Sequence, residues 1–586
     1  MFLPSRTLLA HLTCSGLLCL PLAASSRPVS QDEKLPDLKG EIDLSIRWLR
    51  SKQDHATGAY GDSLETTALV LRALARSPRR YVRRDGPLVA RALDHLLAHQ
   101  SPQGWIAEPD ATDAERLEET RAAARALFLF VDAETTPALA RSVAWLGRLG
   151  VADPAADDAP RTLPRAEAHA RAVQLLATRQ GDGSWDGQGG RVQATARAVL
   201  ELSALHPVLR KKSDLPRGAE PLPALRVVDR AQVDASVLRG AHFLIAAADD
   251  GRWGAPRQPD AGITAMVLGA LQTVPQPRPT DVQQVIDSGL QWIAGLQRED
   301  GSIHQGRLAN YVTSACVLAL ARSGREAYRP ILDRARAFLV ELQADEGEGY
   351  SADHPFYGGI GYGGDERPDL SNLQMALEAL VASGLDEDHQ AFRRAVSFLE
   401  RCQNRSESSD LRVLGPQGVI VAGNDGGASY YPGDSKAGFE VLEDGRRIPR
   451  SYGSMTYALL KGYVFAGLDK EDPRVKACWD WLQEHYTLDV NPGFEHSADP
   501  TAAYQGLFYY FHSMSRALAV FGTEVVVDSD GRAHHWRAEL AGRLIAMQSK
   551  LDGSWVNQNA ARWYEGNPVL ATSYALLTLA ETRGIQ

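Results

Sequence analysis

The residues whose types and spacing are best suited to chemistry gather near residue 499. The stretch 497–502 (SADPTA) places Asp499 directly before a segment with helical periodicity, and Glu495 and His496 stand close by. An acid at the mouth of a buried helix can donate a proton when neighbouring groups keep it protonated. The same pattern fits a helix cap, because Asp is a favoured N-cap residue and Pro500 suits the first turn. The sequence leaves both roles open.

Aromatic residues are concentrated in the C-terminal half of the chain. Five of them are candidates for lining an internal cavity: Tyr504, Phe508, Trp479, Tyr457 and Trp563. If they face inward, they make an apolar, tyrosine-rich cavity that suits a polyprenyl chain and equally a sugar stacked on the rings. Ordinary core packing between helices explains the same residues.

Two glycine-rich stretches in this half predict loops at one rim of the fold. They are residues 357–365 (YGGIGYGGD) and 423–433 (GNDGGASYYPG). The first matches G-x-G-x-x-G, but no strand precedes it, so the dinucleotide-binding interpretation lacks its required context. Asp365 and Asp425 are rim carboxylates that could serve as a catalytic pair. Turn and cap chemistry is the alternative for both.

No cofactor or metal site is expected. The sequence contains no G-x-S-x-G, H-E-x-x-H or P-loop motif. His534 and His535 have no partner at a spacing typical of zinc ligands.

A repeated turn in the sequence indicates the helices that must position these residues. Residues 548–555 (QSKLDGSW) follow one apolar-periodic segment and precede another, and residues 180–185 (QGDGSW) and 100–105 (QSPQGW) repeat the unit. A helix ends near the Gln, a Gly-containing turn follows, an aromatic anchors it, and the next helix begins. The repetition predicts a stacked array of helix pairs.

About nine helix pairs can be traced, and their arrangement predicts an all-α protein built as an α/α toroid. We expect three pairs in an N-terminal helical-repeat domain, residues 40–205, a proline-rich linker at 206–232, and six pairs in an α6/α6 toroid, residues 233–586. Strand patterns are nearly absent, and only residues 523–527 suggest a short hairpin arm.

Composition excludes some functions. The net charge of -10 gives no basic footprint, so no nucleic-acid partner is expected. Residues 1–25 have the charged start, apolar core and small-residue end of a signal peptide, which predicts an exported protein, periplasmic or extracellular, and whether the signal is cleaved stays open. No transmembrane segment is expected in the mature chain. Cys316, Cys402 and Cys478 are too few and too scattered for a disulfide framework.

With these turns, the sequence resembles the terpenoid cyclase and protein prenyltransferase superfamily over roughly residues 40–586. The Q-x(3–5)-G-x-W units are similar to the QW repeats of squalene-hopene and oxidosqualene cyclases, and prenyltransferase β-subunits share the toroid. The resemblance implies that the Gln and the aromatic tie adjacent helix pairs together. That structural role would fall to three pairs: Gln100 with Trp105, Gln180 with Trp185, and Gln548 with Trp555.

The resemblance also tests the candidate acid. Class II cyclases use a D-x-D-D-T-A type motif, and no D-x-D-D occurs here. Residues 497–502 keep the middle acid, Asp499, and the Thr-Ala, but not the flanking acids. The prenyltransferase zinc ligands, a D-x-C pair and a later His, have no counterpart in the mature chain, which agrees with the expectation of no metal.

Three functions remain open. The first is an exported cyclase-like isomerase that lacks an intact D-x-D-D, with Asp499 as proton donor and Glu495 and His496 tuning it. The second is a non-catalytic scaffold that binds lipid, glycan or protein. The third is a polysaccharide-active α/α-barrel enzyme that uses Asp365 and Asp425. The ligand expected is accordingly an apolar isoprenoid or a glycan.

Overall fold

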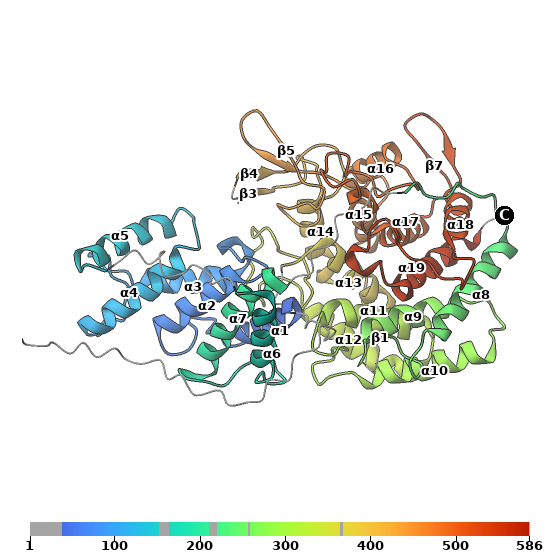
Figure 1. The fold of residues 1–586 in the computed structure, drawn as a ribbon. Helices are drawn as coiled ribbons and strands as arrows, with labels where there is room; N and C mark the ends of the chain where they lie inside the picture. Colours follow the sequence, from blue (N-terminus) through green and yellow to red (C-terminus); the bar gives the residue numbers. More distant parts are fainter. Residues whose placement is uncertain are drawn as a thin grey trace, which may run out of the picture.

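The computed structural model describes residues 38–151, 163–209, 220–255, 258–363, 367–415 and 417–584. The described residues contain nineteen α-helices and a few short strands. The helices form two groups with separate hydrophobic cores, one from Leu38 to Leu209 and one from Val228 to Leu579. Figure 1 shows the first group, here called the N-terminal lobe, on the left and the second on the right. The predicted signal peptide, residues 1–25, lies outside the described residues.

The second group is a closed toroid of two concentric helix rings. The inner ring consists of α9 (Ala261–Leu271), α11 (Ala309–Arg322), α13 (Leu370–Ala382), α15 (Gly453–Phe465), α17 (Leu507–Phe521) and α19 (Pro568–Glu581). The outer ring consists of α8 (Arg230–Ala246), α10 (Thr280–Gly295), α12 (Arg329–Glu341), α14 (Gln390–Cys402), α16 (Pro473–Glu484) and α18 (Trp536–Met547). Each inner helix packs on the next, and α19 packs on α9, so the ring closes. The predicted all-α toroid is confirmed.

Residue patterns explain which helices lie inside. The α9 sequence AGITAMVLGAL is apolar on nearly all sides, as expected for a helix enclosed by neighbours. The outer helix α14, QAFRRAVSFLERC, has a single apolar stripe that includes Phe392, Phe398 and Leu399, and carries arginines on its other face. Burial of such a stripe against the inner ring is what holds an amphipathic helix in place.

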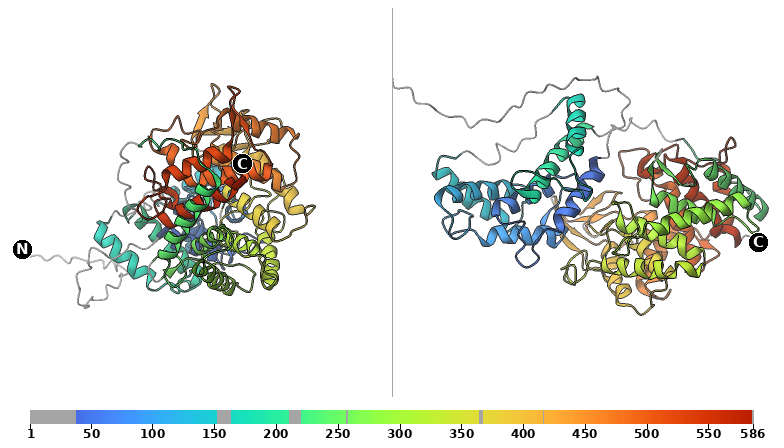
Figure 2. Two further views of the ribbon diagram at one scale, coloured as in Figure 1. Left: turned by 90° about the vertical axis from the view of Figure 1, so that its right-hand side faces the viewer. Right: turned by 90° about the horizontal axis from the view of Figure 1, so that it is seen from below.

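The N-terminal lobe is an open arc of helices. Its members are α1 (Leu38–Arg50), α2 (Leu64–Arg76), α3 (Pro87–Ala98), α4 (Asp113–Leu127), α5 (Thr135–Arg148), α6 (Arg165–Leu176) and α7 (Gly190–Leu209). Three of the expected pairs are present, but the sequence analysis missed α5, which packs on α4 and α3. In space α2 lies between α4 and α7, so the third pair packs beside the first pair and not beside the second. Figure 2 shows this lobe from two further sides.

The repeated turns hold neighbouring pairs together through a constant set of contacts. At the turn after α10, Gln297 Nε2 donates to Ile331 O of the next outer helix, at 2.9 Å. Ile303 N donates to Thr313 Oγ1 at the start of the next inner helix, at 2.9 Å. Gly301 has a positive φ, and a Cβ there would lie 2.4 Å from Arg334 O. Glycine is therefore required where the turn touches the outer helix.

Two of the predicted repeat glutamines tie neighbouring helices, and one complete pair, Gln548 with Trp555, holds as a unit. Gln100 Nε2 donates to Ala138 O of α5 at 2.8 Å, and Gln548 Nε2 donates to Ser236 O of α8 at 3.0 Å. Trp555 is buried, and its Nε1 donates to Leu544 O of its own preceding helix at 2.7 Å.

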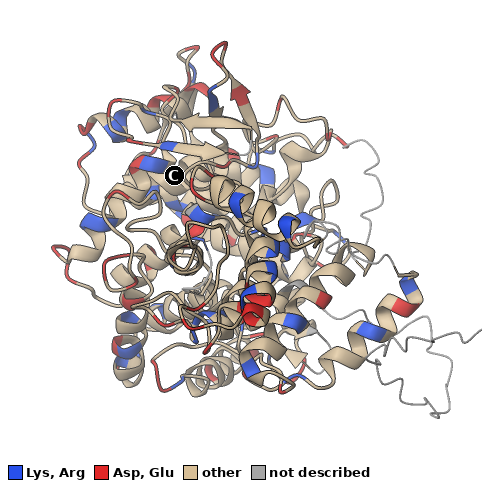
Figure 3. Ribbon diagram, turned by 90° about the vertical axis from the view of Figure 1, so that its left-hand side faces the viewer, with Lys and Arg blue, Asp and Glu red and all other residues tan. Residues whose placement is uncertain are grey.

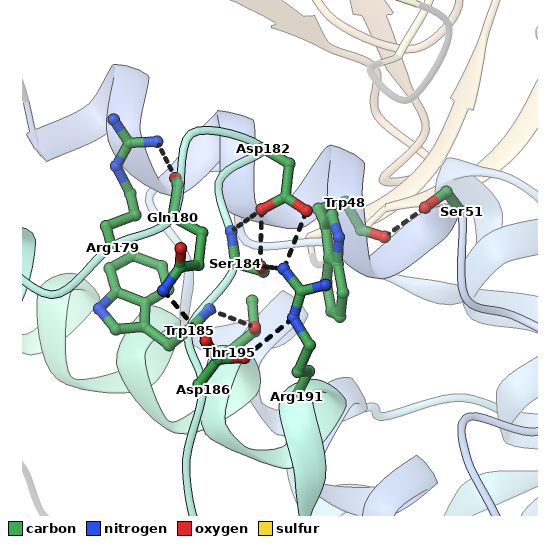
Figure 4. A network of polar contacts seen from close by, with 10 residues as sticks. All are labelled: Trp48, Ser51, Arg179, Gln180, Asp182, Ser184, Trp185, Asp186, Arg191 and Thr195. Carbon is green, nitrogen blue, oxygen red and sulfur yellow. Dashed lines mark hydrogen bonds and ion pairs between the residues drawn. The ribbon is translucent and has the colours of Figure 1, made fainter.

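The other repeat residues need correction. Trp105 is only half-buried, and Ile106 takes the inward position, with its N–H donating to Thr120 Oγ1. Gln180 Nε2 donates to Asp186 within its own turn, while Trp185 keeps the anchoring role. Figure 4 shows this third turn beside Trp48 of α1. There Arg191 bonds Asp182, and its guanidinium carbon lies 5.2 Å from the Trp48 ring centroid. An arginine therefore links the third pair to the first pair, its neighbour in space.

A four-stranded sheet between α14 and α15 was not predicted. Its order is β3 (Arg412–Gly415), β4 (Gly418–Val421), β6 (Arg447–Pro449), β5 (Phe439–Val441), and only β4 and β6 run parallel. The hairpin expected near residues 523–527 is confirmed as β7 (Val526–Val527) paired with β8 (Ala533–His534). The remaining short elements are β1 (Gly254–Ala255), β2 (Gln258–Pro259), η1 (Arg83–Asp85), η2 (Glu326–Tyr328), η3 (Ala502–Tyr504), η4 (Arg562–Tyr564) and η5 (Thr582–Gly584).

Polar contacts join the lobe to the toroid. Arg307 pairs with Glu41 of α1 at 2.7 Å, and Arg367 lies 3.5 Å from the buried Asp85 and donates to Arg79 O at 2.9 Å. Helix α7 extends to Leu209 and α8 begins at Arg230, so the regular helices reach into both ends of the proposed linker, 206–232. The domain division itself stays a prediction.

In the view of Figure 3, charged residues of both signs are interspersed along the ribbon. None of the helices in the described part of the chain is long and apolar enough to cross a bilayer.

Candidate functional site

Asp499 lies in the turn before η3 and α17, partly exposed on the rim of the toroid. Its Oδ1 accepts hydrogen bonds from Thr501 N at 2.9 Å and Thr501 Oγ1 at 2.8 Å, and its Oδ2 accepts one from Gln505 Nε2 at 2.9 Å. The backbone hydrogen bond from Thr501, followed by the other donors, lowers the pKa of Asp499. A proton donor needs a raised pKa. Asp499 therefore closes a turn just before η3, without capping η3 or α17, and its role as a proton donor stays a prediction that the lowered pKa does not favour.

The two expected partners of Asp499 do not tune it. Glu495 accepts a hydrogen bond from Gly493 N at 3.0 Å, and His496 is exposed in the same loop. Among the contacts of the described residues, neither side chain bonds Asp499.

A closer counterpart of D-x-D-D-T-A lies at the start of α9, where the sequence analysis did not look. Residues 260–265 read DAGITA, which keeps the first Asp and the Thr-Ala but has Gly262 and Ile263 where the motif has its other carboxylates. Asp260 caps α9 by accepting from Ile263 N at 2.8 Å, and Thr264 Oγ1 accepts from Trp253 N. Aligning on the Thr-Ala pair instead of on an acid would have found this stretch.

The predicted cavity-lining aromatics mostly lie between helices. Trp479 of α16 packs on Phe521 of α17, with ring centroids 4.8 Å apart, so it fills the space between the rings. Tyr457 packs on Tyr510, 5.8 Å away. The assignment of both as cavity-lining residues was wrong.

The remaining three aromatics do not line the axis either. Phe508 is buried in the core against Phe511. Tyr504 is half-buried beside Asn557, which donates to its carbonyl, and Trp563 is 42% exposed on the rim.

Other tyrosines face the axis of the toroid. Tyr311 of α11 and Tyr574 of α19 meet with hydroxyl oxygens 3.2 Å apart, although α9 separates their helices. Ser371 of α13 and Tyr509 of α17 meet across α15 at 2.8 Å. Tyr311, Tyr509 and His512 sit on enclosed helices, yet each keeps some surface accessible to solvent. The axis is therefore lined by hydroxyl groups that solvent can reach.

A charged cluster lies toward the C-terminal ends of the inner helices. Lys461 is 2% exposed and bonds Glu378 at 2.5 Å, and Arg516 bonds the other oxygen of Glu378 at 2.6 Å. Burial alone would raise the pKa of Glu378, but the two cations outweigh burial and lower that pKa to about 2. Arg516 also reaches Glu581 of α19 at 3.4 Å. The cluster joins α13, α15, α17 and α19 around the axis.

Two other buried carboxyls cap inner helices. Asp369 accepts from Asn372 N at 2.9 Å at the start of α13, and burial raises its pKa to about 6. Glu565 accepts from Tyr509 N at 2.8 Å at the start of α17 and from Asn557 Nδ2 at 2.7 Å, and burial raises its pKa to about 7. Both have pKa values close to neutrality, unlike Asp499.

The two glycine-rich loops meet at one rim. Tyr362 and Tyr430 lie with hydroxyl oxygens 3.4 Å apart, and Leu370 N donates to Tyr430 O. Asp365 lies outside the described residues. Asp425 is exposed in its turn, where it accepts from Gly427 N and Ser451 Oγ. The pairing of Asp365 with Asp425 therefore stays a prediction.

Surface hollows lie away from the axis. One of about 390 Å³ separates α3 from the turn near residue 350 and is lined by residues such as Arg91, Gly349 and His354. Another of about 360 Å³ lies beside α16. No three His, Cys, Asp or Glu side chains of the described residues lie close enough together to hold a metal ion.

Known proteins were compared with this chain. Residues 258–415 match the squalene-hopene cyclase C-terminal domain. A comparison with functionally curated proteins finds no match.

Solved structures give loose matches. The type II terpene cyclase MstE from Scytonema is 15% identical, with a TM-score of 0.36, and the match covers 61% of this chain and 99% of that one. A protein from Actinoplanes is 15% identical, with a TM-score of 0.34 and coverages of 61% and 100%. The ent-copalyl diphosphate synthase from Streptomyces platensis is also 15% identical, with a TM-score of 0.23 and coverages of 61% and 92%. TM-scores this low support no inference about the ligand of this chain. Residues 258–415, which include the start of α9, are thus similar to the squalene-hopene cyclase C-terminal domain, and the resemblance to the terpenoid cyclase superfamily is confirmed there.

Proposed function

We propose that this protein is an exported, non-catalytic binding scaffold that uses the axis of a cyclase-type toroid to hold a small hydroxyl-rich ligand, such as a sugar. The observation that carries the proposal is the polar lining of the axis, together with Gly262 and Ile263 in the place of motif carboxylates. Export rests on the signal-like residues 1–25.

The axis is poorly suited to cyclising an isoprenoid. Such a reaction needs a protonated acid in a dry, apolar cavity, because water and nucleophilic oxygens quench carbocations. Here Tyr311, Tyr509 and Tyr574 direct oxygens to the axis, and solvent reaches part of it.

The same lining suits a ligand with hydroxyl groups. Gln374 is 2% exposed, and its Oε1 has no hydrogen-bond partner among the described residues; the same holds for the buried Nδ1 of His512. An unpaired buried polar atom costs about 1–3 kcal/mol. Burial and nearby Lys461 lower the pKa of His512 to about 3, so its ring is neutral and can accept a hydrogen bond. Both atoms are buried, so a ligand hydroxyl would have to displace neighbouring side chains to donate to them.

Calorimetry on the purified mature protein tests the proposal. The probes are glucose and its disaccharides on one side and geranylgeraniol on the other. Tyr509→Phe removes one axis hydroxyl and is expected to weaken sugar binding about tenfold, since that factor corresponds to about 1.4 kcal/mol. Tyr457→Phe, which changes a tyrosine between helices, is the matched control and should bind as wild type does. Enzymatic conversion of geranylgeranyl diphosphate to a cyclic product would contradict the proposal.

A second candidate function follows from Asp369. Its buried carboxyl, with a pKa of about 6, accepts a hydrogen bond from Tyr430 and is the Asp of this toroid whose raised pKa best matches the protonated acid expected from the resemblance. If Asp369 is the acid of a cyclase-like reaction, Asp369→Asn abolishes turnover of the isoprenoid, whereas Asp499→Asn leaves that turnover intact. Absence of turnover in wild type returns the assignment to the scaffold.

A further inference from the structure

Trp563 and Tyr564 are two consecutive large aromatics that the fold exposes on a strained backbone. Their φ angles are 56° and 69°, and their exposed fractions are 42% and 65%. The left-handed region costs roughly 1–3 kcal/mol for each non-glycine residue. Strain of this kind persists only where surrounding contacts hold it, and it is concentrated at functional positions.

Buried contacts under the two rings hold them in place. The next residue, Glu565, is 1% exposed and bonds the start of α17 through Tyr509 N. Asn557 N donates to Glu565 O at 3.0 Å, and Asn557 Nδ2 donates to a Glu565 carboxyl oxygen at 2.7 Å. The Trp563 ring rests on Gly506, where a Cβ would lie 2.8 Å from Trp563 Cε3. The rings are therefore presented rigidly, so a ligand loses little entropy of the protein on binding.

A row of planar polar side chains adjoins the rings. Arg562 lies with its guanidinium carbon 5.4 Å from the Trp563 ring centroid, and its Nη1 donates to Gln505 Oε1 at 3.0 Å. Gln505 Nε2 donates to Asp499 Oδ2 at 2.9 Å. Asp499 and Arg562 keep further donor and acceptor capacity. Asp499 therefore belongs to this row and also holds its own turn through Thr501.

This combination matches the chemistry of a sugar chain. A pyranose ring has an apolar C–H face that stacks on an aromatic ring and an edge of hydroxyls that bonds planar polar groups. We propose that Trp563 and Tyr564, with the row Asp499, Gln505 and Arg562, form a platform that binds a neutral polysaccharide chain. The platform is separate from the axis and does not depend on it.

Other occupants fit less well. Exposed Trp and Tyr also occur at membrane interfaces, but the carboxylates of Asp499 and Glu495 repel an anionic lipid surface. Two rings offer much less area than the roughly 1,600 Å² of a stable protein interface.

Titration of the full mature protein with soluble hexasaccharides of glucose, xylose and N-acetylglucosamine tests the platform. Wild type is expected to bind at least one of them, and Trp563→Ala is expected to weaken that binding at least tenfold. Leu551→Ala is the matched control, because Leu551 is 95% exposed and is not part of the platform. Trp563→Tyr should restore most of the affinity, and equal thermal midpoints show that the variants are folded.

The outcomes separate the platform from the axis. Tyr509→Phe should leave hexasaccharide binding unchanged, while Trp563→Ala should leave glucose and disaccharide binding at the axis unchanged. The platform proposal is overturned if wild type binds none of the hexasaccharides, or if Trp563→Ala binds them as tightly as wild type. Binding of phosphatidylglycerol vesicles that Trp563→Ala abolishes, without any sugar binding, would reassign the surface to a membrane and likewise overturn it.

Discussion

Glu565 is a single carboxyl on which two surfaces of the toroid depend. Its side chain caps α17, whose Tyr509 faces the axis, and its backbone follows the exposed Trp563 and Tyr564. Sequence reasoning did not find it, because its neighbours in the chain are polar and aromatic residues typical of a surface loop. Its burial comes from contacts with α17, which lies more than forty residues earlier.

The raised pKa of Glu565 predicts a pH dependence of stability. Burial raises that pKa from 4.5 to about 7, so the folded protein holds the proton more tightly than the unfolded chain does. The stabilisation from this proton is fully present below the unfolded pKa and is lost as pH rises through about 7. We expect the thermal midpoint of wild type to fall between about pH 4.5 and 7 and to level off above pH 7, and Glu565→Gln to reduce that slope. Glu495→Gln, at an exposed position, should keep the wild-type slope.

Glu378 behaves in the opposite way. Its pKa is lowered to about 2, so its contribution to stability is present above the unfolded pKa and is lost only as pH falls through about 2. Lys461→Met removes one of the two cations that neutralise this buried carboxylate. Breaking a buried ion pair on one side typically costs about 3–5 kcal/mol.

Urea unfolding of the Lys461→Met variant measures this cost. Lys476→Met, which breaks the exposed pair with Glu471, serves as control and should unfold as wild type does. A Lys461→Met variant as stable as wild type would show that the cluster does not hold the inner helices together.

At the scale of elements, the repeated turn organises the fold through a threonine in the following helix, which recurs in four inner helices of the toroid and in three helices of the N-terminal lobe. Tyr60, Ile106, Trp185, Trp253, Ile303, Ala428 and Trp555 each donate a backbone hydrogen bond to such a threonine: Thr67, Thr120, Thr195, Thr264, Thr313, Thr456 and Thr572. The position after the turn is therefore more constant than the aromatic itself.

Replacing one of these threonines tests the contact. Thr313→Val has nearly the same shape but leaves Ile303 N without its acceptor in a buried place, which costs about 1–3 kcal/mol. Thr313→Ser retains the hydroxyl and should lose much less stability. Chemical unfolding of the two variants in parallel distinguishes them. Equal stability of the two variants would rule out the hydrogen bond as the reason why a threonine recurs at this position of the repeat.

Prediction from the sequence succeeded where local signals determine structure. The helices on either side of residues 548–555 were predicted correctly, because apolar periodicity and a glycine-containing turn mark them locally. The sheet of β3 to β6 was missed because its strands have only three or four residues, too few to show a clear alternating pattern. Trp105 was preferred to Ile106 because local sequence does not fix which of two adjacent residues faces inward.

The candidate site was harder to predict for the same reason. The charge of Asp499 depends on Gln505 and the exposure of its turn, and the pKa of Asp369 depends on burial by several helices. Burial and hydrogen-bond partners of this kind follow from the assembled ring and not from a motif.

At the scale of the molecule, the two helical groups are joined by charged side chains more than by apolar ones. Arg367 reaches Asp85 and Arg79 O, and Glu41 pairs with both Arg179 and Arg307. Interfaces of this polar kind are weakened by salt and permit relative motion.

Arg367→Ala should therefore loosen the two groups. We expect a larger radius of gyration in small-angle scattering, with an increase that grows with salt concentration. Arg329→Ala, which affects an exposed pair with Asp333 on α12, is the control. Unchanged scattering of Arg367→Ala in high salt would mean that other contacts fix the arrangement.

The ring closes through the last turn of the chain, where Gln548 bonds Ser236 across 312 residues of sequence. During synthesis from the N-terminus, α8 and α9 emerge long before α19, the neighbour that completes the ring. Until then the sides of α9 and α17 that α19 will cover remain open, and these sides are apolar. A nascent or truncated chain therefore exposes an apolar, aggregation-prone surface until residue 581 has been synthesised. Such a chain depends on chaperones until its final helix arrives.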